Sequence, residues 1–78
     1  METLYYTATP QIFEADGIIT GGTGWKDINL YTIDTQAMNL VLIAEIEAPY
    51  GNNSEAEIQA WMDEDEFWGA DTYDFEQL

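Results

Sequence analysis

The feature that most constrains this chain is its charge. Sixteen Asp and Glu side chains oppose one basic side chain, Lys26, so the net charge is −15 over 78 residues. Mutual repulsion on this scale destabilises a compact state, which makes the near-absence of Lys and Arg informative. The charge is also uneven, because residues 1–44 contain five of the acids and residues 45–78 contain the other eleven with no basic residue. We therefore expect the C-terminal half to present an acidic surface.

The composition nevertheless indicates a folded protein. Hydrophobic residues make up 46% of the chain, with three Trp, five Tyr and three Phe, far more than a disordered acidic tail contains. A chain of 78 residues predicts a single domain, 1–78, with a small core. Because Cys and His are both absent, disulfides, thiolate chemistry and the usual structural zinc sites are excluded.

The first half of the chain predicts strands. Residues 2–9 are β-branched and aromatic, and Pro10 is expected to end that strand. Residues 11–15 predict a second short strand, followed by a turn-rich passage with four glycines between Gly17 and Gly24. Residues 25–34 alternate apolar and polar side chains with a period of two, which is typical of a half-buried strand.

The second half predicts helices. Residues 35–48 have an N-cap candidate in Asp34 or Thr35 and apolar residues at helical spacing, so we expect a helix, with a buried strand over residues 40–46 as the open alternative. Ser54 and Glu57 match a capping box, which predicts a helix from Ser54 to about Glu66.

These elements together predict an α+β fold, in which a small antiparallel sheet of about three strands packs with one or two helices. The expected core consists of Trp25, Tyr31, Leu40, Ile43, Ile58, Trp61 and Met62.

Several classes of function lack support in the sequence. An EF-hand loop starting at Asp63 fails, because Phe67 and Trp68 occupy positions that need an oxygen ligand and a glycine. The glycines between residues 17 and 24 lack the lysine of a phosphate-binding loop. No apolar run approaches the roughly 18 residues that span a bilayer, and no basic region opens the chain. We expect a cytosolic protein that is not an enzyme and needs no cofactor or metal.

Binding to a basic partner is the function that the acids favour. Acidic residues three or four apart on a helix lie some 5–6 Å from each other, a spacing comparable with that of phosphates along a DNA strand. The four consecutive acids at 63–66 would also be unfavourable near a helix C-terminus, because the helix dipole is negative there. Stability alone therefore does not explain them. We expect an acidic DNA mimic that does not itself bind nucleic acid. The expected partner-binding residues are Asp63, Glu64, Asp65, Glu66, Trp68, Asp71, Tyr73, Asp74 and Glu76.

Two segments, FEADGIITGGTGWKDI at 13–28 and QAWMDEDEFWG at 59–69, resemble the N-terminal domain of the ArdA-type antirestriction proteins of phages and mobile elements. In size and charge the chain is also similar to small acidic anti-CRISPR proteins. These resemblances imply an inhibitor from a phage or mobile element that occupies the DNA-binding surface of a host defence nuclease complex, with an anti-CRISPR role ahead of an antirestriction one. The family's later domains and dimerising region have no counterpart here, so inhibition by an elongated dimer is not implied.

Other interpretations remain open. The acids are also compatible with a solvated face that only keeps the protein soluble. A small acidic adaptor or regulatory protein could bind a basic protein through the aromatic segment containing Trp68, Tyr73 and Phe75. A chaperone of histone-like basic proteins is a third possibility. Salt separates the first binding mode from the second, since binding by a phosphate mimic weakens steeply with ionic strength.

Overall fold

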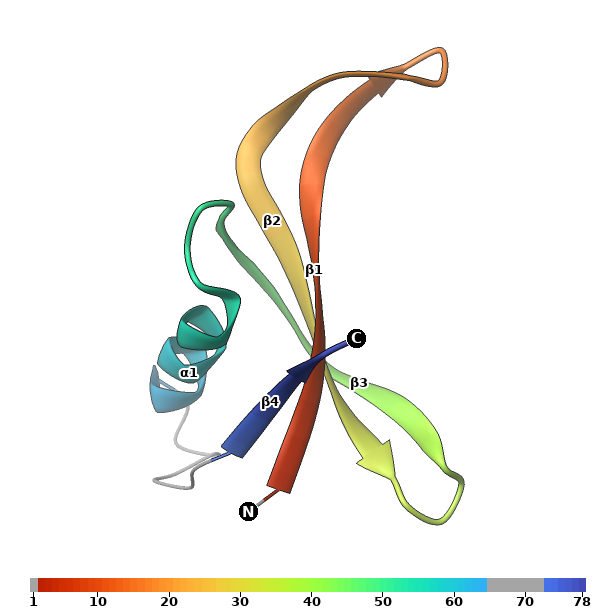
Figure 1. The fold of residues 1–78 in the computed structure, drawn as a ribbon, viewed down its shortest axis with the longest axis vertical. Coiled ribbons are helices and arrows are strands. Elements are labelled where there is room, and N and C mark those ends of the chain that lie inside the picture. Colours follow the sequence, from red (N-terminus) through yellow and green to blue (C-terminus); the bar gives the residue numbers. More distant parts are fainter. Residues whose placement is uncertain (1, 65–72) are drawn as a thin grey trace.

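The computed structural model describes residues 2–64 and 73–78. Within them the chain forms β1 (Glu2–Ala15), β2 (Ile18–Asp34), β3 (Asn39–Pro49), α1 (Ser54–Glu64) and β4 (Tyr73–Gln77). The strands make one sheet in the order β3-β2-β1-β4 (Figure 1). β2 is antiparallel to β1 and β3, whereas β4 runs parallel to β1. The α+β class is therefore confirmed, with a mixed sheet of four strands in place of about three antiparallel ones.

The β1–β2 hairpin extends far beyond the rest of the sheet (Figure 1). Its turn is Asp16–Gly17, and both residues have positive φ, 51° and 78°, as a tight type I′ hairpin turn requires. Ending the first strand at Pro10 was wrong: β1 continues through Pro10, where the pairing register shifts before Ile12. A proline is tolerated there because β4 pairs with β1 only as far as Tyr6, which leaves that edge of β1 free.

The segment after β2 corrects the helix predicted over 35–48, because residues 39–49 form strand β3. Asp34 does behave as the predicted N-cap, because its carboxylate accepts hydrogen bonds from the amides of Gln36 and Ala37. The helical turn ends at once, since Met38 adopts a left-handed φ of 57° and redirects the chain into β3. Asp34 thus caps a hairpin turn in place of a helix.

A β-bulge breaks the period of two along β3. Leu30 pairs with Ala44 but Tyr31 pairs with Leu42, so Ile43 is an extra residue on β3. Both Ile43 and Ala44 pack against the core, and the alternation changes phase at that point. Leu40 and Leu42, which a regular strand would direct inward, consequently point to the opposite face.

Helix α1 begins close to its predicted start but with a different cap. The Asn53 side-chain oxygen accepts a hydrogen bond of 3.0 Å from the Ala56 amide, so Asn53 is the N-cap. The expected capping box of Ser54 and Glu57 does not form, because Glu57 accepts a hydrogen bond from the Asn52 side chain instead. The predicted extension of this helix beyond Glu64 lies outside the described residues.

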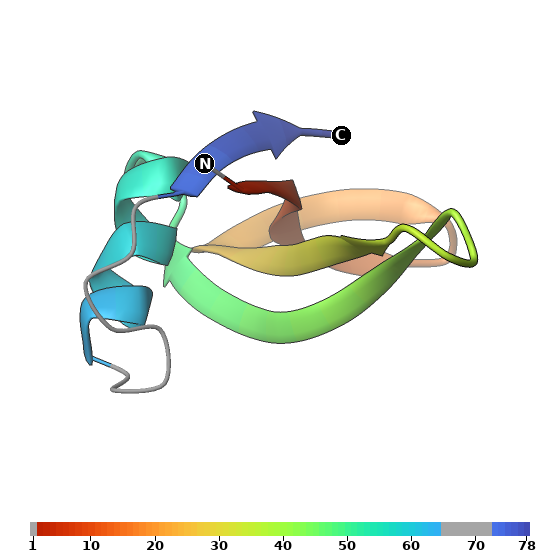
Figure 2. The same cartoon turned by 90° about the horizontal axis from the view of Figure 1, so that it is seen from below.

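The core lies between α1 and one face of the sheet (Figure 2). The buried hydrophobic residues are Leu4, Tyr6, Ile28, Leu30, Ala48, Ile58 and Met62. Ile58 and Met62 were predicted correctly, and Trp61 and Ile43 pack against this cluster while half-buried. Three core predictions were wrong: Trp25 and Leu40 are both 45% exposed, and Tyr31 is half-buried on the other side of the sheet.

Candidate partner-binding surface

Lys26, the one basic side chain, is withdrawn from the surface. It lies on the core face of β2 and is only 6% exposed. Its Nζ donates hydrogen bonds to the backbone carbonyl of Asn52 and, over 2.8 Å, to the Ser54 hydroxyl, which join the sheet to the start of α1. Because no other Lys or Arg exists in the chain, the exposed charged side chains are all acidic.

The predicted site residues that the structure describes do not form one cluster. Asp63 and Glu64 are exposed in the last turn of α1. Asp74 and Glu76 are exposed on β4 and alternate with Tyr73 and Phe75, which pack against the core. Their side chains therefore point to the sheet face opposite α1. Asp65, Glu66, Trp68 and Asp71 lie outside the described residues.

Sequence reasoning missed a second acidic group on the same sheet face. Asp27 on β2 pairs directly with Glu47 on β3, and Glu45 lies two residues along. These carboxylates and Ile46 line a hollow of about 360 Å³. The Gln11 side chain donates a hydrogen bond of 2.9 Å to Asp27. The group could have been found only by assigning residues 39–49 to a strand, which brings the two chain halves into register.

Apolar side chains occupy the middle of this face. Glu76, Tyr5, Tyr31 and Leu42 are successive neighbours across the four strands, and Ile33 pairs with Leu40 two residues further along β2. Leu40 and Leu42 are 45% and 47% exposed, and the two tyrosines are half-buried. Because no helix or strand of residues 2–64 and 73–78 packs on this surface, we call it the uncovered face; its apolar centre consists of Tyr5, Tyr31, Ile33, Leu40 and Leu42.

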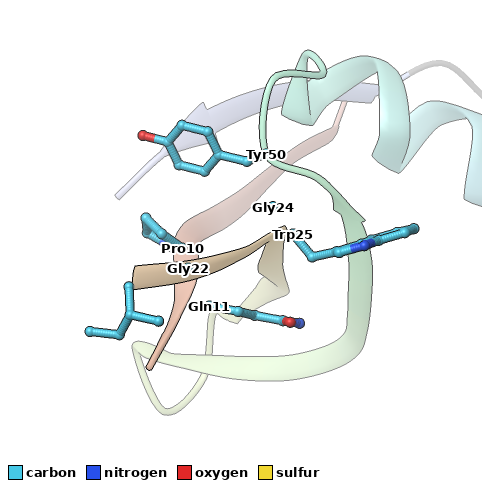
Figure 3. A pocket seen from close by; sticks show the side chains of 7 residues that line it. Pro10, Gln11, Gly22, Gly24, Trp25 and Tyr50 are labelled. Atoms are coloured by element: carbon cyan, nitrogen blue, oxygen red, sulfur yellow. The ribbon is translucent and has the colours of Figure 1, made fainter. Parts of the chain in front are cut away.

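A shallow groove at the base of the β1–β2 hairpin is a weaker candidate for a binding site than the uncovered face. It measures about 260 Å³ and is lined by Pro10, Gln11, Ile12, Gly22, Gly24, Trp25 and Tyr50. The Trp25 and Tyr50 rings point away from each other (Figure 3), so they do not enclose a ligand between them. Gly24 has a φ of 84° within β2, which accommodates the irregular pairing there.

Only one described ionisable group combines burial with an altered proton affinity. Burial raises the pKa of Tyr6, and the neighbouring charge of Glu55 and a hydrogen bond to it raise that pKa further. Tyr6 belongs to the core beneath α1, so this shift concerns stability. The described residues contain no group of Asp and Glu side chains placed to hold a metal ion. No helix in the described part of the chain is long and apolar enough to cross a membrane.

Comparison with known protein families, with curated protein sequences and with solved structures finds no match for this chain.

Proposed function

We propose that this chain is a DNA mimic from a phage or mobile element that inhibits a host defence nuclease complex by occupying its DNA-binding surface. An anti-CRISPR role stands first and an antirestriction role second. The observation that carries the proposal is the burial of Lys26, which leaves side-chain charge of only one sign on the surface. A domain that needed only solubility would gain stability from a few exposed lysines, which this chain lacks.

The geometry of the acids supports the same function. Alternate residues on a strand lie about 6.5 Å apart, so the acidic pairs of β3 and β4 form two short rows of negative charge at the two edges of the sheet. Such rows can replace phosphates in a basic channel and release the same counterions as DNA. Because its own field repels phosphate, the chain should not bind DNA itself.

Competition with DNA tests this function. Purified CRISPR effector complexes and restriction enzymes are incubated with labelled target DNA and increasing amounts of the chain, at several salt concentrations. We expect displacement of DNA from at least one complex, and weaker displacement as salt rises. A control with DNA and the chain alone should show no association. Failure to displace DNA from any complex, or displacement insensitive to salt, contradicts the proposal.

Charge reversal identifies the acids that act. If the acids at 63–66 stand in for phosphates, replacing Asp63 and Glu66 by Lys should abolish inhibition, whereas replacing Glu2 and Glu14 by Lys should matter much less because they lie in the sparsely charged half of the sequence. Equal losses from the two pairs would mean that only net charge matters. No loss from Asp63 and Glu66 would exclude these two acids from the contact.

The alternative function, an acidic adaptor that docks through aromatic side chains, now has a different physical basis. Tyr73 and Phe75 are half-buried and pack against the core, so they contribute to the stability of the fold. The apolar centre of the uncovered face is a described surface that favours protein docking. Binding that persists in high salt would support this adaptor function.

A further inference from the structure

The apolar centre of the uncovered face is built by a specific device in the strand. Without the bulge opposite Leu30, Leu40 and Leu42 would share the core face with Ala44, Ile46 and Ala48. The bulge instead places two leucines beside Ile33 and the two tyrosines, next to one another and open to solvent. A contiguous apolar patch that is exposed on a protein often marks a site of interaction with another molecule.

Acidic side chains border this apolar centre on two sides. Asp27, Glu45 and Glu47 lie beyond it along β2 and β3, and Asp74 and Glu76 lie beside it on β4. An apolar centre with a charged rim is the usual anatomy of a protein–protein interface. The charged side chains of this rim are all acidic, so a partner that complements them must be basic.

We propose that the uncovered face is the surface by which this chain contacts its target, and that the target presents an apolar patch flanked by Arg or Lys. The inference rests on the proposed function, because it names the part of the mimic that docks. It also moves the main contact away from the acids of α1, which lie on the other side of the sheet. A purely electrostatic contact would have no use for exposed leucines at its centre.

A second copy of this chain does not fit the same face. Pairing the face with itself brings together two surfaces that both carry net negative charge, and the only basic side chain is buried and cannot neutralise them. The occupant must therefore supply positive charge.

The test uses a probe of defined chemistry and a matched pair of variants. The probe is an 18-residue helical peptide with a leucine stripe flanked by arginines, and binding is measured by isothermal titration with the full chain. Leu42→Glu adds negative charge to the uncovered face, and Val41→Glu adds the same charge to the neighbouring position on the opposite face. Leu42 and Val41 are 47% and 43% exposed, so exposure is matched. Far-UV spectra and thermal unfolding verify that both variants fold.

The two models predict opposite results. If the uncovered face docks, Leu42→Glu weakens peptide binding by about tenfold or more and Val41→Glu leaves it unchanged or tighter. If charge alone drives binding, both variants bind as tightly as the wild type or tighter, which overturns the inference. Peptide-induced amide shifts should centre on Tyr5, Tyr31 and Leu42; shifts centred on Asp63 and Glu64 also overturn it.

Further measurements separate this inference from the proposed function. The double substitution Asp27→Asn with Glu47→Gln should weaken peptide binding more than Asp63→Asn with Glu64→Gln. Sedimentation of the unbound chain should show a monomer, and a dimer that Leu42→Glu dissociates would assign the face to a second copy and overturn the inference. No binding of the peptide also overturns it, whereas DNA competition by the same protein would leave the proposed function standing.

Discussion

Asp27 on β2 and Glu47 on β3 occupy directly opposite positions in the sheet, and both carboxylates line the same hollow. Like charges placed opposite each other on neighbouring strands destabilise the pairing. The one hydrogen bond described for the Asp27 carboxylate comes from the neutral Gln11 amide. The chain therefore maintains a repulsive pair at the rim of the uncovered face, as expected where a charge pattern is kept at the expense of stability.

Neutralising one member of this pair should stabilise the protein. We expect Glu47→Gln to raise the free energy of unfolding by about 0.2–1 kcal/mol, because the repulsion from Asp27 is removed while the side chain keeps its size. Urea denaturation at low salt measures the change, and the gain should shrink in high salt. Glu14→Gln is the control, because Glu14 pairs with the uncharged Ile19. A loss of stability in Glu47→Gln would contradict the interpretation.

Removing the buried cation should have the opposite effect. Lys26→Met keeps the aliphatic stem but leaves the Asn52 carbonyl and the Ser54 hydroxyl without their donor. We expect a loss of about 1–3 kcal/mol in the free energy of unfolding, the usual cost of an unsatisfied buried polar group. In a double-mutant cycle, Ser54→Ala should cost less in the Lys26→Met background than in the wild type. Additive losses would show that the contact between Lys26 and Ser54 contributes nothing.

Tyr6 should make the fold sensitive to alkaline pH. Its pKa is raised by burial and by Glu55, above the unfolded value of about 10. The neutral hydroxyl therefore contributes stability that is present in full below about pH 10 and is lost as pH rises through the folded pKa. Unfolding free energies of the wild type and Tyr6→Phe, measured from pH 8 to 12, should converge above pH 10. Tyr50→Phe, at a 59% exposed position, should parallel the wild type throughout.

The amino-acid sequence predicted those elements whose signals are local. The alternation over residues 25–34 gave a correct strand, and Ile58 and Met62 gave a correct helix face. The type I′ signal of Asp16–Gly17 was present but was obscured by the assumption that Pro10 ends the strand. That assumption fails because a proline at a free edge forfeits no ladder hydrogen bond.

Non-local features account for the remaining errors. An extra residue at Ile43 changes the phase of β3, so its apolar residues do not keep the regular period of two by which a strand is recognised in a sequence. Register also decides the site, because Asp27 and Glu47 are 20 positions apart and meet only through pairing of β2 with β3. The sequence predicted acidic residues as the site but could not assign them to faces of a sheet whose strands were incompletely recognised.

The end of the β1–β2 hairpin should be the least stable part of the described fold. In the sheet, residues 12–15 and 18–22 pair only with each other, and Ile12, Phe13, Ile18 and Ile19 are all exposed. An isolated two-stranded ribbon is marginally stable in water, so this segment should open without global unfolding. Native-state hydrogen exchange should therefore be faster at Phe13 and Ile19 than at Leu30. Equal protection of all three amides would show that the hairpin and the core unfold together.

A glycine substitution at the turn tests the same idea selectively. Gly17 has a φ of 78° with open space around its Cα, so Gly17→Ala introduces backbone strain without a steric clash. We expect it to destabilise the hairpin end by about 1 kcal/mol and to speed exchange at Phe13 and Ile19 while Leu30 changes little. Gly51→Ala is the matched control, because Gly51 also has open space but no left-handed φ, and exchange in the hairpin should stay as in the wild type. If Gly17→Ala accelerates exchange at Leu30 as much as at Phe13, the hairpin end is not an independent unit and its turn stabilises the whole sheet.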